Sequence, residues 1–60
     1  MLEYIMEFLR FTGIHPETFG RLSVNDPDLI YKLQNPEFKL FDDARQRILN
    51  FIHDYEDAKS

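Results

Sequence analysis

The sequence predicts an all-α protein, a compact four-helix domain formed by 60 residues. Three observations support this fold class. Apolar residues recur at intervals of three and four, which is the spacing of one face of a helix. Glycine and proline stand between these segments, where helices end and begin. No segment shows the strict alternation of apolar and polar residues that is typical of a half-buried strand.

The first predicted helix covers residues 2–12 and is apolar over most of its circumference. Its polar residues form one narrow stripe, and Gly13 follows at a position where many helices end in a left-handed residue. The other residues form two apolar stripes, one of Met1, Tyr4, Phe8 and Phe11 and one of Leu2, Ile5, Met6 and Leu9. One stripe is expected to face the core, and the other to cover the last helix or form an interface.

The second predicted helix covers residues 16–23. Pro16 suits the first helical position, where no amide donor is needed. His15 stands where Ser or Asp usually caps a helix, so this cap is expected to be weak. Phe19 and Leu22 are expected to face inward, and Gly20 is expected to let another helix approach closely.

The third predicted helix covers residues 26–35, with Asn25 or Asp26 as its cap and Pro27 in its first turn. The proline that follows Asn35 ends it, because the residue before proline is disfavoured in the α region. The residues expected to face inward are Leu29, Ile30 and Leu33.

Residues 36–41 are predicted to be a loop, and residues 42–57 the last helix, capped by Asp42 or Asp43. The loop residues expected to fold back onto the core are Phe38, Leu40 and Phe41. The apolar stripe of the last helix consists of Ala44, Ile48, Phe51, Ile52 and Tyr55, with Leu49 beside it. The chain then ends in an acidic tail.

The composition restricts the classes of function. The net charge is −4, and the acidic excess is greatest from Asp54 onward. This charge disfavours non-specific nucleic-acid binding, which depends mainly on positive charge, but it does not exclude a local basic patch. Without cysteine there is neither a disulfide nor a thiolate metal site, and so small a core would benefit from self-association. The N-terminal segment has neither a signal-peptide pattern nor a membrane-span pattern, so we expect a soluble, cytoplasmic protein.

No residue pattern indicates catalysis. His15 and His53 lie on different predicted helices without metal-site spacing, and Ser23 has neither a neighbouring histidine nor an elbow glycine. We therefore expect no enzyme activity, no cofactor and no metal site.

Two short helices across a tight turn, with apolar spacing set against a small residue, are typical of a helix-turn-helix. Phe19-Gly20, followed ten and thirteen residues after Gly20 by Ile30 and Leu33, resembles the lambda-repressor-like (Cro/C1-type) family. The run "TGIHPETFGRLSVNDPDLIYKL" is similar to small bacterial or phage members of it. The sequence departs from the family at Val24, where the turn glycine would fall; Asn25, which tolerates positive φ, follows.

The resemblance implies DNA binding and transcription regulation, by a protein that acts as a homodimer through its apolar first or last helix. The N-terminal part of the second helix of such a motif meets base edges in the major groove. The residues expected to read bases are Tyr31, Lys32, Gln34 and Asn35, and those expected to hold phosphates are Arg21 and Lys39. Arg45 and Arg47 lie about 200° apart on a helix, so at most one of them joins the same patch.

The acids at the start of the third predicted helix favour a different function. Relatives often have an arginine-rich helix here, whereas this chain has Asp26 and Asp28, which phosphates would repel unless bases compensate. Both aspartates are also suited to capping a helix and to its positive end. The alternative is a helix-turn-helix scaffold reused as an acidic protein-interaction module or inhibitor that binds a basic partner protein.

Overall fold

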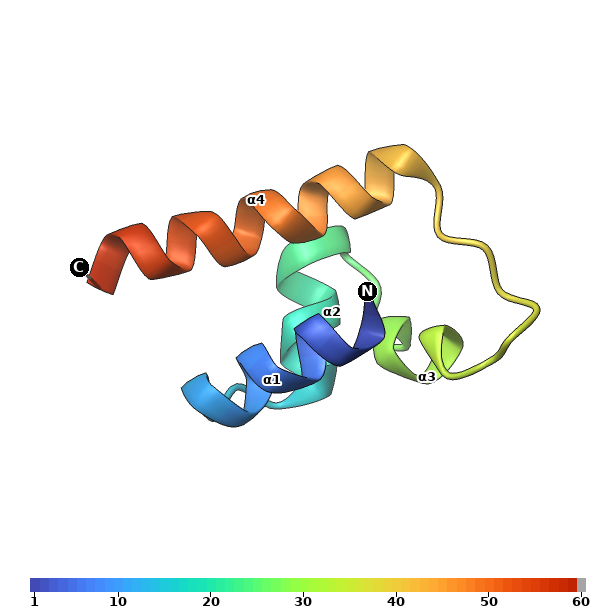
Figure 1. The fold of residues 1–60 in the computed structure, drawn as a ribbon, viewed down its shortest axis with the longest axis horizontal. Helices are drawn as coiled ribbons and strands as arrows, with labels where there is room; N and C mark the ends of the chain where they lie inside the picture. Colours follow the sequence, from blue (N-terminus) through green and yellow to red (C-terminus); the bar gives the residue numbers. More distant parts are fainter. Residues whose placement is uncertain (60) are drawn as a thin grey trace.

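Four helices and the segments that join them make up residues 1–59, the part of the chain that the computed structural model describes (Figure 1). The helices are α1 (Leu2–Thr12), α2 (Pro16–Val24), α3 (Leu29–Leu33) and α4 (Asp42–Lys59). Within these described residues there is no strand. The all-α, four-helix prediction is therefore confirmed.

Local sequence signals set the start and end of the first two helices. Gly13 is left-handed at φ 78°, and its N–H donates to the Leu9 carbonyl, which ends α1. His15 is extended, and its Nδ1 accepts the N–H of Glu17 at 3.1 Å. The imidazole thus caps α2 in the way a serine or aspartate oxygen would, although we expected a weak cap from the sequence.

Asn25 ends α2 in the left-handed conformation, at φ 59° and ψ 36°. Its N–H donates to the Arg21 carbonyl at 3.0 Å, which is the bond of an αL helix end. The next N–H, that of Asp26, donates to the Gly20 carbonyl at 3.0 Å. Asn25 therefore has positive φ at the turn between α2 and α3, as predicted.

Helix α3 is shorter than the predicted residues 26–35. The Asp26 carboxylate accepts the N–H of Asp28 at 3.0 Å, so Asp26 closes a turn before the helix and does not cap the helix itself. Asp28 occupies the capping position, but its side chain makes no capping hydrogen bond. After Leu33 the N–H groups bond three residues back, Gln34 to Tyr31 and Asn35 to Lys32, because the chain is tightening before the proline.

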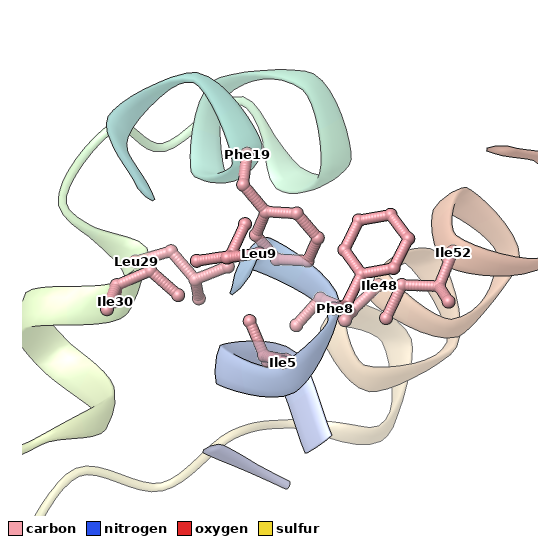
Figure 2. Packing of buried hydrophobic residues seen from close by; sticks show 8 residues of the cluster. All are labelled: Ile5, Phe8, Leu9, Phe19, Leu29, Ile30, Ile48 and Ile52. Atoms are coloured by element: carbon pink, nitrogen blue, oxygen red, sulfur yellow. The ribbon is translucent and has the colours of Figure 1, made fainter. Parts of the chain in front are cut away.

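The core consists of eight buried side chains from all four helices, shown in Figure 2: Ile5, Phe8, Leu9, Phe19, Leu29, Ile30, Ile48 and Ile52. It takes one residue from the first predicted stripe of α1, Phe8, and two from the second. The rest of the first stripe stays partly or largely exposed. Ile48 and Ile52, both completely buried, confirm the predicted inward face of α4.

Aromatic rings link α1, α2 and α4. The ring centre of Phe19, on α2, lies 5.8 Å from that of Phe8 and 5.4 Å from that of Phe51. Phe8 also meets Tyr55 edge-on at 5.4 Å. Such pairs add about 0.5–1.5 kcal/mol each beyond the burial of their area, so they supply stability that a disulfide-free chain of this size needs.

Two predictions about inward-facing residues were wrong. Leu22 is 61% exposed. On an ideal helix it lies roughly 130° from the buried direction, which Phe19 and Gly20 define together with the half-buried Ser23 and Val24.

In the loop, only Leu40 packs against the core, while Phe41 is 78% exposed and Phe38 is 37% exposed. Phe41 directly precedes α4, and its carbonyl accepts the N–H of Arg45 at 2.9 Å, so the start of that helix sets its position.

Candidate nucleic-acid interface

Gly20 allows α3 to lie directly against α2. A Cβ added at this position would overlap the Asp26 carbonyl oxygen and lie 3.1 Å from the Cβ of Leu29. Leu29 and Ile30 are buried next to it, and Leu33 is packed at the edge of the core. The predicted close approach at Gly20 and the predicted anchors are therefore present, and together they fix which face of α3 points to solvent.

Three of the predicted base-reading residues lie together on that outer face. Tyr31 is 79% exposed, and it lines one open surface hollow with Gln34 and Asn35. The Asn35 Oδ1 accepts the N–H of Glu37 at 3.0 Å, which holds this side chain in a turn. Gln34 makes no such bond among the described residues, so its amide is the freer of the two.

Lys32, the fourth predicted reader, is paired with Asp26. Its Nζ lies 2.7 Å from Asp26 Oδ2. Hydrogen bonds from Lys32 and from the Asp28 N–H lower the pKa of Asp26, and the bond to Asp26 raises the pKa of Lys32. At neutral pH both groups are therefore charged and largely cancel each other, which leaves Asp28 as the uncompensated acid at this tip.

The residues expected to hold phosphates are not part of the hollow. Arg21 Nη2 lies 3.4 Å from Glu17 Oε1, one turn away on α2, and both side chains are more than half exposed. Lys39 is exposed in the loop and, in the part of the chain described, has no carboxylate within ion-pairing distance. Arg47 is paired with Asp43 at 3.3 Å.

A second surface feature was not predicted as a site. A groove between α1 and α4 is lined by Tyr4, Glu7, Phe8, Phe11 and Glu56. The sequence signal for it is the stripe of Tyr4, Phe8 and Phe11, which we assigned to the core or to an interface. Only Phe8 of that stripe is buried.

Within the described part of the chain, no group of three or more His, Asp or Glu residues could hold a metal ion. None of the described helices is long and apolar enough to cross a membrane. Comparisons with protein-family models, with curated proteins and with solved structures give no match. The functional argument therefore depends on the residues and geometry of this chain alone.

Proposed function

We propose that this chain is a small helix-turn-helix DNA-binding protein, a transcription regulator that reads duplex DNA with the outer face of α3. The observation that carries the proposal is the close approach of α2 and α3 at Gly20. This approach, with Ile30 buried behind it, leaves Tyr31 and Gln34 directed to solvent beside each other.

These side chains have the chemistry that base reading needs. A glutamine amide can donate to and accept from the edge of adenine, which makes Gln34 the principal candidate. Tyr31 supplies an aromatic surface and a hydroxyl next to it. Lys39 is an exposed, unpaired cation among the described residues and is suited to a phosphate contact.

The acidic tip of α3 opposes DNA binding less than the sequence suggests. Because Lys32 compensates Asp26 locally, only Asp28 adds an unpaired charge at this end of the helix. An aspartate in this position could accept a hydrogen bond from cytosine N4. The tip would then contribute to selectivity and not only to repulsion.

A titration against pooled random-sequence duplex DNA, first at low and then at rising salt, tests the proposal. We expect log K to fall with log salt by about 0.9 for each phosphate neutralised. Gln34→Ala should cost about 1–3 kcal/mol of discrimination between enriched and other sites. Its control is Gln46→Ala, which removes the same amide from the exposed surface of α4.

Two results would overturn the proposal: no binding at low salt, or equal selectivity losses for the two glutamine variants. Lys39→Met should reduce the salt slope by about 1 if this lysine contacts a phosphate. The predicted homodimer stays a prediction, which sedimentation of the free protein and of its DNA complex would measure.

Binding of a basic partner protein is the second candidate function, and the ion pairs favour it. Arg21, Lys32 and Arg47 are each occupied by a carboxylate of the same chain. Three of the seven bases are therefore occupied, on a chain that has eleven acids. Such a surface complements a cationic protein better than it complements phosphate.

A further inference from the structure

A groove lies between α1 and α4, two helices whose C-terminal ends lie at the end of the molecule away from α3 (Figure 1). Its aromatic lining is Tyr4, Phe8 and Phe11, three residues that share one side of α1. Phe8 is 7% exposed and is fixed by its edge contact with Tyr55. Tyr4 and Phe11, which are 44% and 89% exposed, provide the open aromatic surface.

Carboxylates complete the groove from both helices. Glu7 comes from α1 and Glu56 from α4. Both residues are exposed, and neither forms an ion pair with any base whose side chain is described. The groove thus combines accessible π faces with two negative charges that no base side chain in the described part of the chain pairs.

The size and charge of the groove restrict what it can bind. Its volume is about 180 Å³, below the roughly 300–1,000 Å³ typical of small-molecule sites, so one side chain is a better match than a cofactor. Nucleic-acid phosphates would be repelled by Glu7 and Glu56. A twofold contact centred on the groove would bring the same carboxylates of two copies together, which disfavours a second copy.

We propose that this groove binds an arginine side chain from a basic segment of a partner protein. The inference rests on the second candidate function and is independent of DNA binding. A guanidinium group stacks on aromatic rings and pairs with carboxylates through two parallel bonds. Its methylene groups would lie along the apolar wall that Phe8 and Phe11 form.

The test uses the isotope-labelled full chain and a short peptide in which arginines are separated by glycine and serine. Amide chemical shifts should move around Tyr4, Phe11 and Glu56 and saturate, and a lysine version of the peptide should bind more weakly. Glu56→Gln should weaken binding roughly tenfold, the size of one charge-assisted hydrogen bond. Phe11→Ala should weaken it about threefold, the size of an exposed cation–π contact.

Matched variants separate the groove from general charge attraction. Glu37→Gln removes one exposed carboxylate from the loop after α3, and Phe41→Ala removes one exposed ring. Each should change affinity by less than about twofold, because screening weakens the attraction of distant charges. Circular dichroism of every variant must show unchanged helix content and thermal midpoint, which the exposure of the four side chains predicts.

Three results would overturn the inference in different ways. If Glu56→Gln and Glu37→Gln lost equal affinity for the peptide, and amide shifts moved near all acidic residues, the protein would still bind basic partners but the groove would not be the site. Absence of peptide binding at low salt would remove the groove and the second candidate function together, and leave the DNA proposal untouched. If the protein were a homodimer and Phe11→Ala dissociated it, the occupant of the groove would be a second copy of the chain.

Discussion

Substitution of Gly20 by alanine tests the close approach on which the arrangement of α2 and α3 depends. In an ordinary exposed helix this change stabilises by about 1 kcal/mol, because alanine loses less backbone entropy on folding. Here the new methyl group would overlap the Asp26 carbonyl oxygen and lie 3.1 Å from the Leu29 Cβ. The first obstacle is the main chain of the turn between α2 and α3, so relief requires this turn to move away from α2 and to take α3 with it.

The two effects have opposite signs, and overpacking is the larger. Inserting a methyl group into a packed contact costs about 1–3 kcal/mol, and more where the neighbour is main chain. Because the obstacle here is main chain, we expect a cost of about 2–3 kcal/mol, and after the gain of about 1 kcal/mol in helix propensity a net loss of about 1–2 kcal/mol. For a domain of this size that corresponds to a fall in Tm of roughly 5–15 °C.

Urea unfolding followed by far-ultraviolet circular dichroism measures this loss directly. Thr18→Ala, at an exposed position of the same helix, isolates helix propensity and should stabilise slightly. If Gly20→Ala were as stable as the wild type or more stable, α2 and α3 would not be in contact at this residue. The proposed recognition face would then lose its structural basis.

The Asp26–Lys32 ion pair and the left-handed Asn25 give two further predictions. Since the pKa of Asp26 is lowered from 3.8 and that of Lys32 raised from 10.5, the pair contributes fully between these values. Its contribution is lost as the pH falls through the pKa that Asp26 has in the folded protein, or rises through the pKa that Lys32 has there. The stability difference between wild type and Lys32→Met should therefore shrink at both extremes; a difference independent of pH would contradict the pair. Because Asn25 has a φ of 59°, Asn25→Ala should lower the free energy of unfolding by about 1–2 kcal/mol, whereas Asn25→Gly should not lower it. Urea unfolding measures both variants, and equal stabilities would refute this prediction.

The boundaries of α1 and α2 were predictable because their causes are local. Gly13, Pro16 and Asn25 each have a backbone preference that suits one position at a helix end, whatever surrounds them. The buried stripe of α4 was predictable for a similar reason. Its apolar spacing repeats over several turns, and one stripe of that kind has one stable orientation.

The start of α3 and the positions of Leu22 and Phe41 were not predictable in the same way. Asp26 had two uses for its carboxylate, a helix cap or a turn, and the position of α3 against Gly20 decides between them. The exposure of Leu22 depends on which side of the short helix α2 becomes buried. That direction is set by where α3 and α4 pack on α2.

The candidate site shows the same limit. The sequence identified Tyr31, Gln34 and Asn35, which lie together, but it could not show that Lys32 is held by Asp26. These two residues are six apart across a turn, so no helical spacing rule relates them. The α1–α4 groove likewise needs α4 to bring Glu56 beside a stripe that lies more than forty residues earlier in the chain.

The charge distribution bears on whether the two proposed sites could work in one molecule. A net charge of −4 disfavours DNA binding only where the acids are close enough to phosphates to repel them. The C-terminal ends of α1 and α4 lie away from α3 in a molecule 36 Å long (Figure 1), while the Debye length at physiological salt is about 8 Å. The charge of Glu56, near the C-terminal end of α4, is therefore largely screened from the outer face of α3, and Lys32 compensates Asp26 within the α3 end itself. The acidity of the whole chain is thus a weak argument against DNA reading, and a basic protein could occupy the groove while DNA occupies α3.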